Sequence, residues 1–206
     1  MKILSYIFAV VGLVALSYWA VVFVSARRYQ AREAQRFTRE QKAEPDTPTR
    51  SESPTNKKRS YPVTGSPVAL LEIPRLGLSA IVVEGVEERE LKLGPGHIRG
   101  TSLPGDGGNV GVAGHRDTVF RPLRLIRRGD AINVTAHERE YQYKVVSLRI
   151  VEPEDIRVLY PTGHETLTLV TCYPFDFVGS APKRFIVRAD CVECAQPVPI
   201  TSGGTR

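Results

Sequence analysis

The chain has 206 residues, of which 42% are hydrophobic and 24% are charged, so a wholly disordered protein is excluded. Its three cysteines are too few for a scaffold built from disulfides. The net charge of +6 comes from the N-terminal part, because residues 27–60 carry ten Lys or Arg against five Asp or Glu, and Lys2 adds one more. Residues 61–206 hold the remaining 17 basic and 17 acidic side chains and are neutral. Nucleic-acid binding requires clustered positive charge on the binding domain, so we expect no nucleic-acid partner.

Residues 3–26 form an apolar run without a charged side chain. At about 1.5 Å per residue, a helix of this length can cross a hydrocarbon core of roughly 30 Å. A cleaved signal peptide has a shorter apolar region of about 7 to 15 residues, although Val-Ser-Ala at 24–26 leaves that alternative open. Tyr18 and Trp19 suit the membrane interface better than the interior of a soluble domain. We therefore predict that residues 1–26 form one transmembrane helix, which anchors the chain in the membrane lipid.

Residues 27–66 are predicted to be a basic, Pro/Ser-rich flexible spacer. They lack apolar periodicity and cannot bury enough surface to fold, so they would hold the next domain away from the membrane. Six Lys and Arg residues follow the apolar run within 27–42, whereas only Lys2 and the amino terminus precede it. Counted naively, the positive-inside rule would keep the domain in the cytoplasm.

Residues 67–191 are predicted to form a mostly β domain, with residues 192–206 as a C-terminal tail. Short β-rich runs separated by turn residues indicate strands at 68–73, 78–84, 109–114, 131–136, 140–151, 165–171 and 184–189. A short helix is expected at 87–93, and a short helix or turn at 153–159. Seven or eight such strands indicate a barrel or a sandwich. The sequence contains no dinucleotide-binding, P-loop or H-E-x-x-H motif, so nucleotide binding and zinc-protease chemistry have no support.

Two predicted strands end in a residue suited to catalysis. His115 follows the strand at 109–114, and Cys172 follows the strand at 165–171. A thiol must be ionised before it attacks a carbonyl, and a neighbouring imidazole or guanidinium favours the thiolate. Cys172 and His115 would supply such a pair if the fold brings them together, which spacing alone does not establish. Taken alone, a Cys at a strand end is more often a small buried hydrophobe.

The other three histidines, His97, His137 and His164, lie in polar or loop segments without comparable surroundings. We read them as ordinary surface residues.

The pattern around these residues resembles the sortases, the cysteine transpeptidases of bacterial cell surfaces. Thr-Leu-Val-Thr-Cys at 168–172 matches the T-L-x-T-C signature of that family, and Ala-Pro-Lys-Arg-Phe-Ile-Val at 181–187 places Arg184 at the start of a strand. Residues 109–117 are similar to the histidine segment of the family. The His, Cys, Arg order is kept between residues 68 and 190, and residues 113–117 and 181–185 most resemble the class D branch. Outside this resemblance, Arg184 would be read as a surface cation.

The resemblance implies a closed β-barrel of about eight strands with short helices and an active site at one end of a groove. It implies that Cys172 is the nucleophile, that His115 is the general acid and base, and that Arg184 stabilises the substrate carbonyl and the oxyanion. Thr171 is expected to contribute to substrate binding through either its hydroxyl or its backbone. The partners would be secreted proteins bearing an LPxT-type sorting signal and an amine acceptor at the cell envelope. The resemblance also places the domain outside the cytoplasm on a single-pass anchor, against the charge count.

The segment Cys191-Val192-Glu193-Cys194 is a C-x-x-C that a typical sortase does not need. A local disulfide and a pair of free thiols are equally compatible with it, whereas a structural zinc site requires four ligands. We expect no cofactor and no metal. Acidic clusters that could bind Ca²⁺ are more simply read as solvated faces; they comprise Glu84, Glu87, Glu88, Glu90, Glu152, Glu154 and Asp155.

Two rival classes remain open. An L,D-transpeptidase usually carries Ser/Thr-x-Gly-Cys just after a His segment, and Thr171-Cys172-Tyr173 lacks that glycine. A non-catalytic sortase-like barrel that only binds a partner would be expected to lose the Cys, the His or the Arg, and all three are present.

Overall fold

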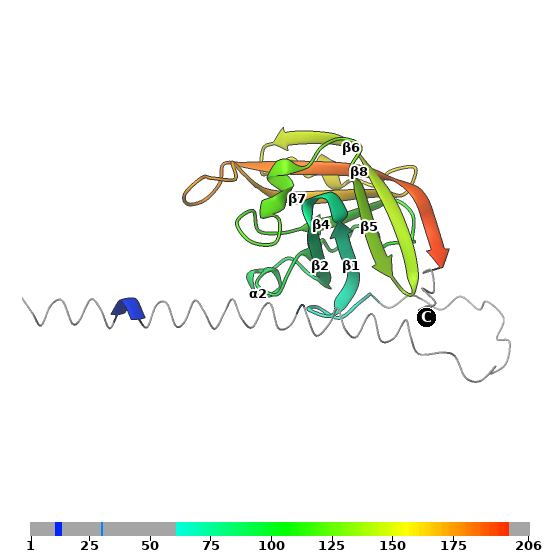
Figure 1. Cartoon of the computed structure of the whole chain (residues 1–206), viewed down its shortest axis with the longest axis horizontal. Helices are drawn as coiled ribbons and strands as arrows, with labels where there is room; N and C mark the ends of the chain where they lie inside the picture. The colour runs from blue at the N-terminus through cyan, green and yellow to red at the C-terminus, as the bar shows by residue number, and fades with distance from the viewer. Residues whose placement is uncertain (1–10, 14–29, 31–60, 198–206) are drawn as a thin grey trace, which may run out of the picture.

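The computed structural model describes residues 11–13, 30 and 61–197. Residues 61–197 form a barrel of eight strands joined by one short α-helix and three 3₁₀ turns (Figure 1). In chain order the elements are β1 (Pro67–Ile73), η1 (Pro74–Leu76), β2 (Leu78–Glu84), α2 (Glu88–Leu91), β3 (Gly96–His97), β4 (Asn109–Ala113), η2 (Arg121–Leu125), β5 (Ala131–Ala136), β6 (Arg139–Val151), η3 (Ile156–Leu159), β7 (Thr166–Tyr173) and β8 (Lys183–Pro197). The predicted mostly β barrel is confirmed.

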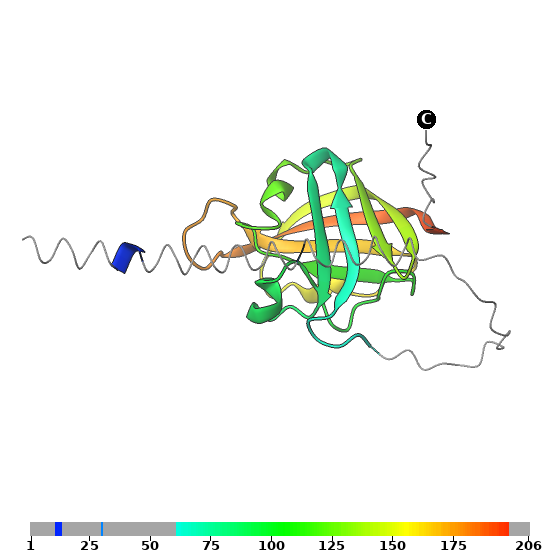
Figure 2. The same ribbon diagram turned by 60° about the horizontal axis from the view of Figure 1, so that its bottom comes forward.

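The strands pair in the order β1-β2-β3-β4-β7-β8-β6-β5, and β5 closes the barrel against β1. Neighbouring strands are antiparallel except β2 with β3 and β4 with β7, which are parallel. The strands therefore wrap around one common interior, as the turned view in Figure 2 shows. The parallel pairing of β4 with β7 matters for function, because both strands end on the same side of the barrel.

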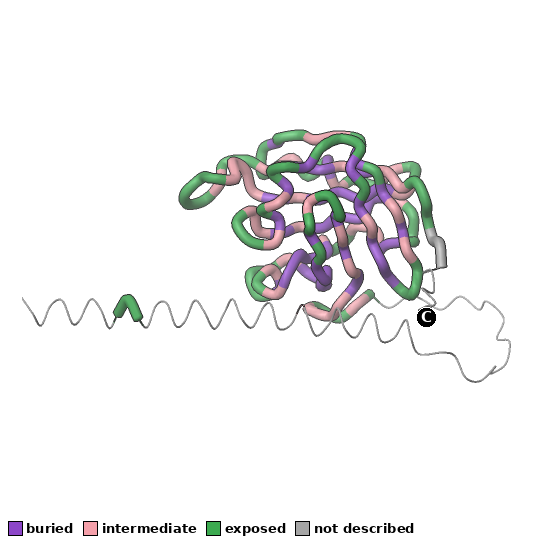
Figure 3. Tube along the Cα trace, in the orientation of Figure 1, coloured by how far each residue is buried: buried purple, intermediate pink, exposed green. Residues whose placement is uncertain are grey.

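The interior of the barrel is filled by one cluster of aliphatic and aromatic side chains. Alternate residues of each strand point inward, and Figure 3 shows buried segments along the strands and exposed segments in the connecting loops. Leu71, Ile132, Tyr143, Leu169 and Val187 are fully buried. Burial of one such side chain contributes about 1.5–3 kcal/mol, so this cluster is the main source of stability for the barrel.

Most predicted strands lie within two residues of their observed bounds, and β7 runs on to Tyr173 so that it includes Cys172. The short helix or turn expected at 153–159 is the 3₁₀ turn η3. Three further elements differ from the prediction. The strand β3 has only two residues and was not predicted, since a run that short has no periodicity to detect. The helix expected at 87–93 is limited to Glu88–Leu91. The strand β8 continues past residue 191, where the end of the barrel was expected, and pairs with the start of β6 up to Pro197.

Gln30 contacts the barrel through its side-chain amide. Its Oε1 accepts a hydrogen bond from the Ile81 N–H at 2.6 Å, and its Nε2 donates to the carbonyl oxygens of Ile81 at 3.2 Å and Leu93 at 2.8 Å. Ile81 lies on β2 where no strand flanks it on the side away from β1, because β3 pairs only with Val83 and Glu84. The Gln30 amide thus satisfies the Ile81 N–H and carbonyl groups, which no neighbouring strand pairs on this side of β2.

The predicted anchor, residues 3–26, lies outside the described residues apart from residues 11–13, which are helical. Within the part of the chain that the structure covers, no helix combines the length and the apolar character needed to cross a membrane.

Candidate active site

The predicted site residues gather where three strands meet at one end of the barrel. The strands β4 and β7 run parallel and both end there, and β8 begins there after the loop that follows β7. This β7–β8 loop projects from the barrel at the left of Figure 1, drawn in orange. The topology therefore brings together the residues after β4, at the end of β7 and at the start of β8.

Cys172 and Arg184 are direct partners in the antiparallel ladder between β7 and β8. Residues that face each other in such a ladder have their side chains on the same face of the sheet, with Cβ atoms about 4.5–5.5 Å apart. The alternate pair, Thr171 with Phe185, lies toward the core, so Cys172 and Arg184 point to the outside of the barrel. The thiol of Cys172 and the guanidinium of Arg184 thus share one half-buried surface.

Part of the Arg184 guanidinium is held by backbone. Its Nη1 donates to the carbonyl oxygens of Ala181 at 3.2 Å and Lys183 at 3.0 Å. Among the described residues, Nε and Nη2 of Arg184 have no hydrogen-bond partner. A guanidinium anchored on one side and free on the other can present a planar pair of donors to a ligand oxygen.

His115 is placed beside Cys172 by the parallel pairing of their strands. Ala113 of β4 lies opposite Val170 of β7, and the Gly114 N–H continues the ladder by donating to the Val170 carbonyl at 3.1 Å. Two residues beyond this pair the chain reaches His115 on one side and Cys172 on the other. The pairing of β4 with β7 and of β7 with β8 therefore places His115, Cys172 and Arg184 at the same end of three neighbouring strands, and all three residues are half-buried.

Gly114 allows the turn that carries His115 to pack tightly. A Cβ atom at this position would lie 2.6–2.9 Å from the ring of Phe120, which is fully buried. The Phe120 N–H in turn donates to the His115 carbonyl at 3.0 Å and closes the turn. No side chain larger than hydrogen fits between the strand end and this ring, which explains the glycine immediately before His115.

The Thr171 hydroxyl, one of the two groups by which this residue was expected to reach the substrate, is bonded within the fold. Its hydroxyl donates to the Gly114 carbonyl at 2.7 Å, and the residue is buried on the core side of the sheet. This hydroxyl is therefore already engaged in holding the segment just before His115 against β7.

An apolar cluster lies next to Cys172 on the same outer face, and its partly exposed members, Val170 and Leu159, form an apolar surface. Val170 and Ile186 are the next outward-pointing pair along the ladder, and they pack with Val158 and Leu159 of η3 and with Val151 at the end of β6. This surface borders the half-buried thiol directly.

Two side chains hold η3 in place above this surface. Arg188 Nη2 donates to the Val158 carbonyl at 2.9 Å, and Asn109 Nδ2 donates to the carbonyls of Val158 and Tyr160 at 3.0 and 3.2 Å. The Asn109 Oδ1 accepts from the Thr168 hydroxyl at 2.7 Å. The first residue of β4 thus fixes the wall of the apolar surface, a role that the sequence did not reveal.

Arg116 connects the His115 segment to the β7–β8 loop. Its Nη2 donates to the carbonyl oxygens of Phe177 at 2.7 Å and Gly179 at 2.9 Å. Sequence reasoning missed this residue, although its place next to His115 is the signal that could have drawn attention to it.

Cys172 is the only free thiol among the three cysteines of the chain, all of which the structure describes. Cys191 and Cys194 form a disulfide within β8, which settles the alternative that the sequence left open. A nucleophilic thiol in this protein can therefore be only Cys172 when that disulfide is intact.

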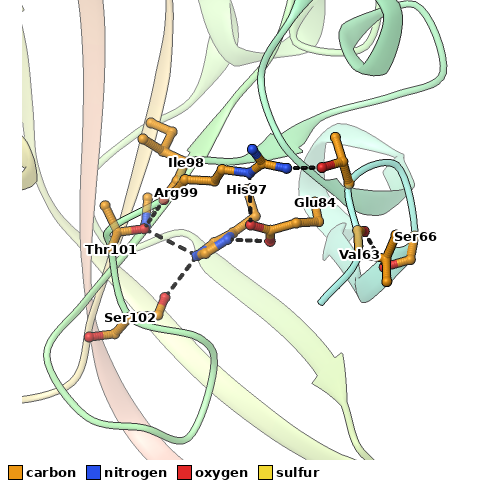
Figure 4. Close-up of polar contacts among 10 residues, drawn as sticks. Val63, Ser66, Glu84, His97, Ile98, Arg99, Thr101 and Ser102 are labelled. Carbon is orange, nitrogen blue, oxygen red and sulfur yellow. Dashed lines mark hydrogen bonds and ion pairs between the residues drawn. The ribbon is translucent and has the colours of Figure 1, made fainter. Parts of the chain in front are cut away.

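His97 is not a surface residue, contrary to the sequence reading. It is 1% exposed, and its Nδ1 lies 2.7 Å from Oε2 of Glu84, which is equally buried (Figure 4). Its Nε2 lies 3.0 Å from the Ser102 carbonyl, which can only accept, so Nε2 is the nitrogen that donates there. The prediction failed because the partner of His97 lies thirteen residues earlier, on β2. His137 and His164 are exposed, as predicted.

The acidic residues considered for calcium lie apart in the structure. Glu84 is bonded to His97, Asp155 accepts from Arg157 at 2.7 Å, and Glu152 pairs with Lys183 at 3.2 Å. Across residues 11–13, 30 and 61–197 no group of three or more His, Cys, Asp or Glu side chains is arranged to hold a metal ion.

Comparison with known proteins identifies the barrel. Residues 71–192, more than half of the chain, match the family model of the sortase domain. The chain belongs to the sortase family. Sortase D of Bacillus subtilis is 37% identical over 133 residues, which cover 64% of this sortase and 67% of that protein. Sortase A of Bacillus anthracis is 28% identical over 129 residues, 61% of this chain and 60% of that one.

Solved structures agree with this assignment. A sortase D transpeptidase from Clostridium perfringens superimposes with a TM-score of 0.59 at 30% identity, covering 64% of this sortase and 82% of that chain. A sortase E from Streptomyces avermitilis gives a TM-score of 0.56 at 34% identity, covering 66% and 93%. The family resemblance inferred from the motifs is thereby confirmed, and this sortase belongs to a family of transpeptidases.

Proposed function

We propose that this sortase is a cysteine transpeptidase that cleaves an LPxT-type sorting signal of a secreted protein and transfers it to an amine. Cys172 is the nucleophile, His115 the general acid and base, and Arg184 the group that stabilises the oxyanion. The proposal rests above all on one observation, that the only free thiol of the chain lies directly opposite a half-free guanidinium.

In the first half of the reaction the Cys172 sulfur bonds to the carbonyl carbon of the Thr in the signal. The carbonyl oxygen becomes an oxyanion, and the unpaired donors of Arg184 stabilise it more strongly than they stabilise the neutral carbonyl. The C–N bond then breaks, and the leaving amine takes a proton from His115. The product is a thioacyl-enzyme.

In the second half an amine attacks the thioester carbon. His115 takes the proton that this amine loses, the C–S bond breaks, and the thiolate of Cys172 is regenerated. One imidazole thus serves both halves, which requires it to stand beside the sulfur. The parallel ladder between β4 and β7 supports that position.

The apolar surface of Val170 and Leu159, which pack with the buried side chains of Ile186 and Val158, supports a peptide substrate with aliphatic residues before the scissile bond. A peptide lying on this outer face would meet aliphatic side chains first and the thiol at its end. The Leu and Pro of an LPxT signal fit that order.

We further propose that residues 3–26 anchor the enzyme in the cell membrane and that the barrel lies outside the cytoplasm, where secreted proteins present their signals. Alkaline phosphatase fused after Arg206 should be active in that arrangement. An inactive fusion, with the same fusion protein shown to be intact and membrane-bound, would place the barrel inside.

The activity is tested by mass spectrometry of the full chain in detergent, incubated with a library of LPxT-x peptides. A mass increase equal to the acyl part of the peptide, mapped to Cys172, is the expected result. If no peptide of the library gives an adduct while an iodoacetamide control labels Cys172, the proposed activity is wrong.

A further inference from the structure

A hollow of about 260 Å³ lies between the His115 segment and the β7–β8 loop. We call it the arginine pocket, and its lining residues other than the phenylalanines are Arg116, Asp117, Arg121, Arg124 and Asp176. The rings of Phe175 and Phe177 complete the wall. The pocket begins one residue after His115 and three residues after Cys172, so it adjoins the proposed active site along both strands.

The arginines of the pocket are not neutralised by neighbouring carboxylates. Among the described residues, Arg116, Arg121 and Arg124 have no Asp or Glu oxygen within 4 Å. Arg116 uses Nη2 to bind the β7–β8 loop, while its Nη1 is buried and has no partner among those residues. An unpaired buried donor is costly, so an oxygen atom from a ligand would be stabilised beside it.

Arg121 and Arg124 are arranged as a pair. Both belong to η2, a 3₁₀ turn in which side chains three residues apart project on the same side. Guanidinium groups bind carboxylates through parallel, charge-assisted hydrogen bonds. Two exposed guanidiniums on one side of a turn, next to a third, therefore form a site for an anionic group.

The two carboxylates of the pocket add a second requirement. Asp117 and Asp176 are exposed and stand among the arginines, so the pocket presents both signs of charge. The carboxylates can attract an ammonium group and the arginines can bind a carboxylate, so a molecule that carries both groups meets a partner for each charge. The thioacyl-enzyme is resolved by an amine, and such an amine must approach His115, which adjoins this pocket.

We propose that the arginine pocket binds the acceptor, and that the acceptor is an amine that also carries a free carboxylate, such as the end of a short peptide. This inference rests on the proposed function and names the class of its second substrate. The carboxylate lies against Arg121 and Arg124, and the amine is thereby held near the thioester of Cys172.

The test compares acceptors that differ only in the carboxylate. The full chain in detergent receives an LPxT peptide as donor and, as acceptor, di-, tri- or tetraglycine with either a free C-terminal carboxylate or a C-terminal amide. Transfer product is measured against acceptor concentration. We expect a KM about 10-fold lower for the free carboxylate at the best length, the size of one or two charge-assisted hydrogen bonds at a partly exposed site.

Variants of the pocket arginines test whether the preference for a free carboxylate arises in the arginine pocket. In the double variant Arg121→Gln/Arg124→Gln the ratio of the two KM values should fall to near one, and added NaCl should reduce the ratio in the unchanged protein because salt screens exposed charges. Arg128→Gln, which removes an exposed arginine that does not line the pocket, should keep the full ratio. A ratio near one in the unchanged protein, or a full ratio in the double variant, would overturn the inference.

Formation of the thioacyl adduct, measured without any acceptor, separates this inference from the proposed function. If the adduct forms on Cys172 but the carboxylate gives no advantage, the assignment of the pocket fails alone. If no adduct forms, the proposed function fails.

Discussion

Cys172 and Arg184 face each other across the ladder between β7 and β8, with the thiol and the guanidinium on the outer face of the barrel. The register of two strands holds this relationship, and both strands are fixed by core residues such as Leu169 and Val187 on their inner face. The positions of Cys172 and Arg184 are therefore set by paired strands, and the β7–β8 loop contributes the Ala181 carbonyl that helps to hold the Arg184 guanidinium.

The first prediction concerns the nucleophile. Cys172→Ala should abolish the thioacyl adduct with an LPxT peptide, because no other free thiol remains. The double variant Cys191→Ser/Cys194→Ser removes the disulfide and should still form the adduct, as measured by mass spectrometry. Retained cleavage in Cys172→Ala together with loss in the double variant would contradict the assignment.

The second prediction concerns proton transfer. His115→Ala should lower turnover by about 10²- to 10⁴-fold, since both halves of the reaction need its proton. Turnover is followed by release of the peptide after the scissile bond. The matched controls are His137→Ala and His164→Ala, which change exposed residues and should leave turnover within a few-fold. Equal losses in all three variants would indicate general damage to the fold.

The third prediction compares the effect on activity of replacing Arg184 with the effect of replacing an exposed arginine outside the site. Arg184→Lys keeps the charge but loses the planar pair of donors, so activity should fall by about 10²- to 10³-fold, and further in Arg184→Ala. The melting temperature should stay nearly constant. Arg188 is unsuitable as a control because it holds η3 through Val158, so Arg128→Lys is the better comparison. Full activity in Arg184→Ala would remove this residue from the site.

The fourth prediction concerns the buried pair of His97 and Glu84. Removing one partner leaves a polar group buried without its hydrogen bond, and breaking a buried pair typically costs about 3–5 kcal/mol. His97→Ala should therefore lower the free energy of unfolding by several kcal/mol in urea denaturation, whereas His137→Ala should leave it almost unchanged. An unaltered unfolding midpoint in His97→Ala would mean that the pair contributes nothing to the fold.

The fifth prediction is a pH dependence. Arg75 donates to both carboxylate oxygens of Asp130, at 2.5 and 2.6 Å, and this hydrogen bonding lowers the pKa of Asp130 below its ordinary value. The folded state thus binds this proton less readily than the unfolded state. The pair stabilises the fold above the unfolded pKa, near 4, and this contribution is lost as the pH falls through the lower, folded pKa.

Asp130→Asn should consequently be less stable than the unchanged protein at neutral pH, and the difference should shrink below about pH 4. Urea denaturation across this range measures both curves. Glu138→Gln, at the exposed turn before β6, is the control and should give a curve parallel to that of the unchanged protein. A difference for Asp130→Asn that grows as the pH falls would contradict the assigned direction.

The sequence predicts the proposed site residues better than it predicts their surroundings. His115, Cys172 and Arg184 could be selected as candidates because each stands near a strand end within a recognisable motif. Their grouping depends on the parallel pairing of β4 with β7 and on the register of β7 with β8, which are long-range features that no local pattern encodes.

The wrong predictions for His97 and for the end of β8 also result from long-range strand pairing. His97 has polar and glycine neighbours typical of a loop, yet it is buried because β3 lies beside β2 and brings it to Glu84. The strand β8 continues to Pro197 because it pairs there with Arg139 and Glu140 of the neighbouring strand β6, and the composition of residues 192–197 does not predict that pairing. Local composition predicts an element, whereas its length and burial depend on its neighbours.

The contact of Gln30 with β2 limits how far the barrel can stand from its proposed anchor. Gln30 follows Ala26, the end of the predicted membrane helix, by four residues, and an extended chain spans at most about 3.6 Å per residue. With that contact formed, the β2 edge lies within roughly 15 Å of the bilayer surface. The length of the chain between Gln30 and the barrel then does not increase the distance between the barrel and the membrane. The enzyme would then search for its substrates by lateral diffusion in two dimensions, and a secreted protein would have to present its signal while still close to the lipid.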